Sequence, residues 1–210
     1  VGGAMKQYLL EKARLSQQIK NERNYHVFYQ MMKGMTAEEK ARCKIEDMKY
    51  YSMLNQSGCN TIDKVDDAKD WAEVKDAATK IGLDDEKWLN VCEILSGVLM
   101  THNVKFHNVE KGGTDSAAEV STEHELHVVC ELFGFDYEEF LAQLTTRWIK
   151  SPGSDPIMAY IKAEDAYHLI TSVGKAVYGF LFAWLVSLIN KVVAEKGGDI
   201  PEHIKEKSWL

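Results

Sequence analysis

Apolar residues recur every three or four positions along most of this chain, the spacing that places side chains on one face of an α-helix. Charged and small polar residues separate them, as expected when one face of a helix packs on a core and the other meets water. Four stripes of this kind stand out: Tyr25, Phe28, Tyr29 and Met32; Trp71, Val74, Ala78 and Ile81; Trp88, Cys92, Leu95 and Leu99; and Leu126, Val129, Cys130 and Phe133. The pattern predicts a mainly α-helical fold.

The stretch Ala163–Glu195 differs from these stripes because it is apolar around most of its circumference. One stripe and three residues that widen it make up this surface: Leu169, Val173, Val177, Leu181, Trp184, Leu188 and Val192, with Ala176, Phe180 and Leu185. A helix that is apolar on nearly all sides is buried among other helices. We therefore expect a long, buried central helix, and we expect Trp184→Ala to leave the chain poorly folded.

The apolar run at 176–186 raises the question of a membrane span. A spanning helix needs about 20 predominantly apolar residues. Here Ser187, Asn190 and Lys191 interrupt the run before that length is reached. The sequence favours a buried core helix, and no membrane span is predicted.

Local signals place the ends of the elements. Three pairs have the spacing of a capping box at a helix start: Thr36 with Glu39, Thr122 with Glu125 and, as a weaker version, Asp136 with Glu139. Three glycines stand where left-handed residues end helices: Gly34, Gly82 and Gly134. Residues 103–109 alternate and predict a short strand, whereas residues 110–119, 151–156 and 197–201 have the composition of loops. Because no long linker divides the chain, residues 1–210 are expected to form a single mainly helical domain around the long helix, with one or two short strands.

Charge and cysteine usage narrow the class of protein. The formal net charge is −7, which argues against nucleic acid as a partner because phosphate backbones demand clustered Lys and Arg. Four widely spaced cysteines form no CxxC pair: Cys43, Cys59, Cys92 and Cys130. Spread in this way they indicate reduced thiols of an intracellular protein rather than a disulfide framework.

The chain carries no convincing catalytic or metal signature of its own. A phosphate-binding GxxxxGK[ST] loop is not present in the 210 residues. His124, His127 and Cys130 recur every third residue, but on a helix His124 and Cys130 point about 120° apart, and zinc needs four converging ligands. Three acidic pairs stand at expected helix starts, where the helix dipole favours negative charge: Asp66–Asp67, Asp84–Asp85 and Glu138–Glu139.

Five strings along the chain resemble signatures of the myosin motor head, in the same order as in that family. They are residues 8–14 (YLLEKAR), 22–30 (ERNYHVFYQ), 54–59 (LNQSGC), 94–106 and 175–190 (KAVYGFLFAWLVSLIN). The resemblance runs from about residue 1 to residue 193. Two departures are notable: residues 96–102 are more polar than in the family, and Phe180 stands where Arg is usual.

The resemblance implies the part of the head between its two switch loops, which is the upper, actin-facing subdomain. Residues 1–20 would form the edge of the central sheet, with a strand over residues 4–10. Residues 21–146 would form a helical block, residues 147–162 an actin-facing loop, and residues 163–195 the long central helix.

The resemblance also implies partners and cofactors. The actin filament and the remaining subdomains of the same motor head would be the partners, and the location would be cytoplasmic and cytoskeletal. ATP and Mg²⁺ would be bound in the intact motor, an actin-activated ATPase, by the phosphate loop and the two switches. Because those elements are not in these 210 residues, the chain alone is expected to hold no cofactor and to hydrolyse no ATP.

By position, the resemblance assigns actin binding to Arg147, Trp148, Ile149, Lys150, Asp155, Ile157 and Met158. The residues themselves fit this role, because apolar side chains on a constrained loop mark interfaces and a basic pair is attracted to an acidic surface. Trp148→Ala is expected to change the melting temperature little. Residues 110–119 correspond to a second, variable loop that we expect to be peripheral.

Asp155 also aligns with a position where the family carries an acid or a phosphorylatable Ser or Thr. A fixed carboxylate would supply that negative charge constitutively. An equally simple interpretation is that Asp155 only forms the turn before Pro156. Ser151 and Ser154 are close enough that a small alignment slip would transfer the role to one of them.

Two functions follow from the sequence. The first is an actin-binding and coupling segment of an ATP-driven cytoskeletal motor. The second is an independent helical interaction module that shares only a scaffold with the myosin head. An enzyme in its own right is a third possibility that no set of residues supports.

Overall fold

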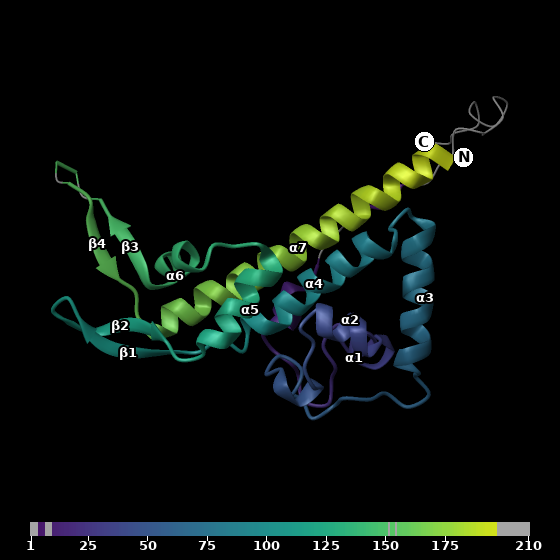
Figure 1. Cartoon of the computed structure of the whole chain (residues 1–210), viewed down its shortest axis with the longest axis horizontal. Helices are drawn as coiled ribbons and strands as arrows, with labels where there is room; N and C mark the ends of the chain where they lie inside the picture. Colours follow the sequence, from purple (N-terminus) through teal and green to yellow (C-terminus); the bar gives the residue numbers. More distant parts are fainter. Residues whose placement is uncertain (1–3, 7–9, 151, 154, 197–210) are drawn as a thin grey trace.

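The computed structural model describes residues 4–6, 10–150, 152–153 and 155–196, and Figure 1 shows their arrangement. The α-helices are α1 (His26–Gly34), α2 (Ala37–Arg42), α3 (Asp67–Lys80), α4 (Asp85–Thr101), α5 (Glu123–Phe133), α6 (Tyr137–Thr145) and α7 (Ala163–Lys196). The short 3₁₀ helices are η1 (Lys12–Leu15) and η2 (Met48–Tyr50), and the strands are β1 (Phe106–Lys111), β2 (Thr114–Val120), β3 (Thr146–Ile149) and β4 (Ile157–Tyr160). The prediction of a mainly α-helical fold is confirmed.

Helix α7 runs along the length of the molecule and organises the other elements (Figure 1). Helix α4 packs against α7 and α5, and α1 packs against α3. The main core is formed where these helices meet, and its largest fully buried side chains include Phe28, Tyr29, Tyr51, Leu99 and Leu126. The two hairpins, β1–β2 and β3–β4, project at the end where α7 begins (Figure 1).

The predicted stripes form the buried faces of four helices. Trp88, Cys92, Leu95 and Leu99 are all buried on α4, and Trp71 and Ala78 are buried on α3. Trp71 and Trp88 also meet, with ring centroids 5.1 Å apart. On α3, burial recurs at helical spacing because one face of the helix packs on α1 and the other meets solvent. Helix α4 lies between α5 and α7 instead, and its last turns are buried on every side.

The helix ends agree with the sequence at some places and differ at others. The Thr36–Glu39 capping box is present, and Asp136 accepts a hydrogen bond from the Glu139 N–H. The predicted capping box of Thr122 and Glu125 is not formed. Thr122 Oγ1 instead accepts from the Lys105 N–H at 2.8 Å, and Tyr50 donates to Glu125 at 2.6 Å.

The three glycines predicted to end helices also agree with the structure only in part. Gly82 and Gly134 adopt positive φ of 89° and 70°, as predicted. Gly34 does not, because it is the last residue of α1 and lies against Trp71, where a Cβ would come within 2.4 Å of the ring. Close packing rather than a left-handed turn explains this glycine.

The strand content was underestimated. The strand expected at 103–109 begins at Phe106, and the loop expected at 110–119 is largely its partner strand, with Phe106 opposite Val120. The expected loop at 147–162 contains a second hairpin, with Trp148 opposite Met158. The small and polar residues of 110–119 hid the first pairing, and the glycine and prolines of 151–156 drew attention to a loop rather than to the strands on either side.

The expectation that α7 is buried on all sides is wrong. Ile170, Tyr178 and Leu181 are buried, but Leu169, Phe180 and Trp184 are 40%, 75% and 45% exposed. Among the described residues, α4 and the hairpins cover one side of the helix, and nothing covers the side that carries Phe180. The proposed core role of Trp184 is therefore not supported, whereas Tyr178 and Leu181 do occupy the core.

By length and composition alone, α7 could cross a membrane. Its buried side packs on α4 and the N-terminal segment, and Lys175 and Asn190 interrupt its apolar surface. These contacts are those of a helix in a folded protein, so a membrane span is not supported.

The strand expected over residues 4–10 lies partly outside the described residues, and residues 4–6 and 10 form no strand. Instead, the Asn190 side chain holds the backbone of Met5. Its Oδ1 accepts from the Met5 N–H at 2.7 Å and its Nδ2 donates to the Met5 carbonyl at 2.8 Å. The Asn190 amide thus bonds both backbone groups of Met5, and it joins the start of the chain to the last turns of α7.

Candidate functional site

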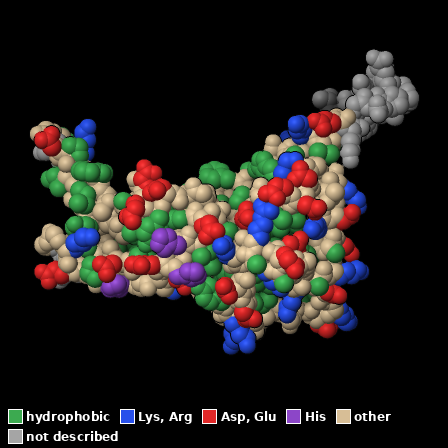
Figure 2. Space-filling model, in the orientation of Figure 1, with side chains coloured by type: hydrophobic (Ala, Val, Ile, Leu, Met, Phe, Trp, Pro, Cys, Tyr) green, Lys and Arg blue, Asp and Glu red, His purple; other side chains and the backbone are tan. Residues whose placement is uncertain are grey.

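The β3–β4 hairpin exposes an unusual amount of apolar surface. Trp148, Ile149, Ile157 and Met158 are 71%, 45%, 67% and 43% exposed. Trp148 lies opposite Met158 and Ile149 opposite Ile157, and directly opposite residues share a face of the ladder. Each face of the hairpin therefore carries one apolar pair, and Figure 2 shows apolar side chains running up this projection.

Charged residues flank the apolar pairs. Arg147 lies on β3, Lys150 follows that strand, and Asp155 precedes β4; all three are exposed. Within the described part of the chain, none of the three makes an ion pair. Their charges are free to meet a partner.

The base of the hairpin is fixed to the rest of the molecule. Ile161, directly after β4, donates its N–H to the Thr145 carbonyl at 2.8 Å and accepts from the Ala118 N–H at 2.7 Å. Its side chain packs with Ala118 and Ala166 in a small core of its own. The hairpin is thereby joined to α6, to β2 and to the first turns of α7.

The β1–β2 hairpin makes two further connections. Asn108 Oδ1 accepts from the N–H of Ala163 at 2.9 Å and so satisfies a donor in the first turn of α7. Gly112, with φ of 59°, lies against the Tyr160 ring, where a Cβ would come within 2.7 Å. Both hairpins are thus anchored on the N-terminus of α7.

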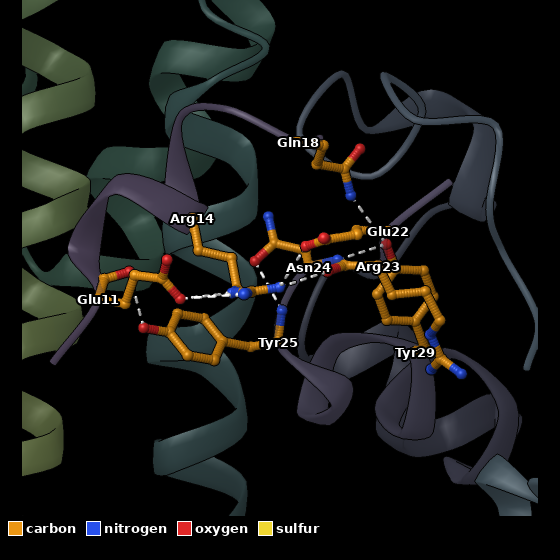
Figure 3. Close-up of polar contacts among 8 residues, drawn as sticks. All are labelled: Glu11, Arg14, Gln18, Glu22, Arg23, Asn24, Tyr25 and Tyr29. Carbon is orange, nitrogen blue, oxygen red and sulfur yellow. Dashed lines mark hydrogen bonds and ion pairs between the residues drawn. The ribbon is translucent and has the colours of Figure 1, made fainter. Parts of the chain in front are cut away.

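A second set of polar contacts surrounds the string at 22–30 (Figure 3). Arg14 pairs with Glu11 at 3.0 Å and Glu22 at 3.6 Å, and its NH1 donates to the Arg23 carbonyl at 3.0 Å. Tyr25 donates to the Glu11 carbonyl at 2.9 Å. These contacts bind the η1 segment to the start of α1.

Arg23 makes the most deeply buried ion pair of the described residues. Its NH2 lies 2.8 Å from Asp67 Oδ1, and the two side chains are 1% and 7% exposed. The guanidinium also lies over the Tyr29 ring, 3.9 Å from its centroid. A buried charge needs such partners because it loses the free energy of hydration. Asp67 lies on α3 and Tyr29 on α1, so Arg23 connects the two helices.

Gln18 and Asn24 join this cluster to the loop at 54–59. Gln18 Oε1 accepts from the backbone N–H groups of Gln56 and Ser57, at 3.0 and 3.2 Å. Its Nε2 donates to Tyr29 Oη at 2.9 Å, and Asn24 Nδ2 donates to the Met53 carbonyl at 3.3 Å. The string at 22–30 is thus connected to the string at 54–59 through Gln18, and directly to the adjoining Met53.

The cluster reaches α7 through aromatic stacking. The Tyr25 and Tyr178 rings stack with centroids 4.9 Å apart and planes 21° apart, and Phe28 lies 6.0 Å from the same ring. Burial raises the pKa of Tyr178, so its hydroxyl stays neutral. The string at 175–190 therefore meets the string at 22–30 in the core.

The family model of the Myosin head (motor domain) matches residues 1–204 of this chain. The chain belongs to the myosin head (motor domain) family.

Curated relatives agree with this assignment. The chain is 35% identical over 192 residues to Myosin-I heavy chain of Dictyostelium discoideum, a match that covers 91% of this chain and 8% of that protein. It is 33% identical over 196 residues to Unconventional myosin-Va of Gallus gallus, covering 92% and 10%. It is 34% identical over 193 residues to Myosin-2 of Saccharomyces cerevisiae, covering 92% and 12%. The chain spans about a tenth of the length of these relatives.

In this segment of a myosin head, all seven residues singled out for filament contact lie on one hairpin. Arg147, Trp148 and Ile149 belong to β3, Ile157 and Met158 to β4, and Lys150 and Asp155 to the connection. Ser151 and Ser154 lie outside the described residues. The structure thus brings the residues together, and their role in binding stays a prediction.

The thiols and histidines of the myosin head segment form no reactive centre among the described residues. Cys43, Cys59, Cys92 and Cys130 are free, and burial raises the pKa of the Cys43 and Cys130 thiols to about 11. His127 stacks on Tyr137 at 3.8 Å. No group of three or more His, Cys, Asp or Glu in the described ranges could hold a metal ion.

Two functional contacts escaped the sequence reasoning. Asp66 and Asp67 stand at the start of α3 as predicted, but Asp67 is also the buried partner of Arg23. Asn190, at the end of the string at 175–190, was not given a role. In both cases the partner is distant, 44 and 185 residues away, and no local pattern could reveal it.

Proposed function

We propose that this chain is the filament-contacting and coupling segment of an ATP-driven motor, and that the filament protein is actin. The observation that carries the proposal is the exposure of four neighbouring apolar side chains on a hairpin whose base is fixed. Aromatic and aliphatic residues held rigidly at the surface are the groups that dominate binding energy at interfaces. Membership of the myosin head family supports actin as the partner.

Coupling would follow the connections already described. The hairpins are anchored on the first turns of α7, and α7 stacks through Tyr178 on Tyr25. Tyr25 belongs to the polar cluster that includes Arg14 and Arg23. Coupling of two sites requires an element with two arrangements that both sites bias, and α7 is the element common to both ends of this path.

The reaction itself would take place elsewhere in the motor. The described residues offer no metal-binding group and the sequence no phosphate loop. We therefore assign ATP and Mg²⁺ to other segments of an actin-activated ATPase, located in the cytoplasm on the cytoskeleton. The other subdomains of the head are the natural cover for the exposed side of α7.

Ile157→Ser in a motor head that contains this segment is expected to weaken binding to filamentous actin. Removing one central apolar anchor from an interface costs about 1–2 kcal/mol, which raises the Kd about five- to thirtyfold. Co-sedimentation with filamentous actin at a fixed salt concentration measures this Kd. Ile19→Ser is the matched control, because Ile19 is also 67% exposed but lies away from the hairpin. If Ile157→Ser and Ile19→Ser change the Kd equally, the hairpin is not the filament contact, and the independent helical interaction module is favoured.

Asp155 tests the electrostatic part of the proposal. If its carboxylate contributes to the filament contact, Asp155→Ala should lower the filament-activated ATPase rate about two- to fivefold, the range of one exposed ion pair. Asp155→Glu should retain the rate because it keeps the charge. If the alanine variant has the activated rate of the parent, Asp155 serves only the turn before Pro156.

A further inference from the structure

The two hairpins touch at a point outside the proposed filament contact. In the turn between β1 and β2, Gly112 lies against the Tyr160 ring, where a Cβ would come within 2.7 Å of the ring atom Cε2. Lys111 Nζ lies 5.6 Å from the centroid of the same ring. Tyr160 is the last residue of β4 and is half-buried. The turn of one hairpin thus holds a side chain of the other.

An irregularity in the β1–β2 pairing directs this turn. Val109 lies opposite Ala117. The next pair is Lys111 opposite Thr114, so β2 has one residue more than β1 between these two pairs. A bulge of this kind bends the strand and increases its twist. The bend agrees with the position of the turn beside β4 (Figure 1).

The place of Tyr160 in β4 connects this contact to the exposed apolar pairs. Tyr160 lies opposite Thr146 at the base of the β3–β4 hairpin. Met158, two residues before it, lies opposite Trp148. Side chains two residues apart on a strand share a face, so the ring supports the face that carries Met158. Because β4 has only four residues, a shift of Tyr160 displaces Ile157 and Met158 as well.

Other contacts fix the base of the β1–β2 hairpin. Asn108 Oδ1 accepts from the Ala163 N–H at 2.9 Å, and the Ala118 N–H donates to the Ile161 carbonyl at 2.7 Å. Both partners follow β4, on the segment that leads into α7. The β1–β2 hairpin therefore supports its neighbour at two levels, at the base through hydrogen bonds and within β4 through a ring packed on a glycine.

We propose that the β1–β2 hairpin sets the orientation of the β3–β4 hairpin toward the filament, and that Tyr160 is the positioning residue through which it acts. Glycine is needed at position 112 because a Cβ would overlap the ring, and because its φ is 59°. Holding a binding element in its bound orientation raises affinity without a new contact. The inference rests on the proposed function and adds to it the residue that controls the geometry of the contact.

Gly112→Ala tests the inference in a motor head that contains this segment. The variant is expected to raise the Kd for filamentous actin about threefold or more in co-sedimentation, because the new methyl group displaces Tyr160. Gly113→Ala is the matched control. Its φ is 80°, so it brings backbone strain of the same kind, but nothing lies within 4 Å of the added Cβ. The control should bind within twofold of the parent, and thermal unfolding should show that both variants are folded.

Variants of Tyr160 test whether the effect passes through the ring. Tyr160→Phe keeps the ring and should bind within twofold of the parent, whereas Tyr160→Leu removes the outer ring atoms and should raise the Kd about threefold or more. Gly112→Ala added to Tyr160→Leu should then have less than a twofold further effect, because the two residues act as one unit. This comparison of Leu with Phe also decides the matter if Gly112→Ala fails to fold.

The outcomes separate the inference from the proposed function. If Ile157→Ser weakens binding while Gly112→Ala and Tyr160→Leu bind as the parent does, the inference is overturned and the proposed function stands. Equal weakening by Gly112→Ala and Gly113→Ala overturns the inference, because backbone strain would be the cause. A full effect of Gly112→Ala in the Tyr160→Leu background also overturns it, because the turn itself would contact the filament. If Ile157→Ser, Gly112→Ala and Tyr160→Leu all bind as the parent does, both fail.

Discussion

Asp67→Ala is expected to lower the free energy of unfolding of the chain by about 3–5 kcal/mol, the usual cost of removing one partner of a buried ion pair. The variant would leave the Arg23 guanidinium, 1% exposed, without its carboxylate. Arg23 Nε and NH1 already lack hydrogen-bond partners among the described residues. No neighbour in the structure therefore replaces the lost contact, and equilibrium urea unfolding should report the full cost.

Two further variants separate this effect from simple loss of an acid. Asp63→Ala removes an exposed carboxylate from the loop before α3 and should change stability by less than about 0.5 kcal/mol. Arg23→Met combined with Asp67→Leu removes both charges and should recover most of the loss, because apolar replacement of a whole buried pair is often tolerated. A double variant as unstable as Asp67→Ala would mean that the charges are not the cause.

His102 should make the chain lose stability as the pH falls from about 6.5 to about 4. The side chain is 1% exposed at the end of α4, Nδ1 lies 3.2 Å from Thr101 Oγ1, and Nε2 has no partner among the described residues. Burial, with smaller contributions from Lys175 and Lys105, lowers its pKa from 6.5 to about 4. The unfolded chain then binds the proton more readily than the folded chain, so stability is complete above pH 6.5 and declines below it.

A lowering of the pKa from 6.5 to about 4 corresponds to roughly 3 kcal/mol at most. His102→Asn should flatten the dependence of the unfolding free energy on pH in this window, whatever its effect at pH 8. Carboxylates such as Glu39 and Glu86, whose pKa values are lowered by their hydrogen bonds and ion pairs, contribute equally to both proteins. Only the difference between the two profiles therefore reports His102, and parallel profiles would show that it does not titrate in the native state.

The helical part of this fold was predictable from the sequence, and the reason is visible in α3 and α4. Helix α3 packs mainly on α1 and the first turns of α4 keep one face exposed, so buried positions such as Trp71, Trp88 and Cys92 recur at helical spacing. The second strand of the β1–β2 hairpin was missed because Ala118 owes its burial to packing against distant segments such as Ile161. Small residues that are buried only by tertiary contact leave no trace in the local pattern.

The error about α7 has a different cause. Periodicity reports that Phe180 and Trp184 are apolar, but it cannot report whether anything covers them. Within the described residues nothing covers Phe180, and the helix is consequently half-exposed. For the candidate site, the resemblance pointed to Trp148 and its neighbours, whereas the pairing of β3 with β4 joins residues that no local pattern connects.

The hydrogen bonds between Asn190 and Met5 have a mechanical consequence. They join two points 185 residues apart in the chain, and Asn190 lies toward the C-terminal end of α7, whereas the hairpins project where α7 begins (Figure 1). From Ala163 to Asn190 the helix axis extends about 40 Å. A rigid rotation of the helix by about 10° at Asn190 would move its first turn by roughly 7 Å. A small tilt near one asparagine would thus become a displacement large enough to engage or release a binding partner.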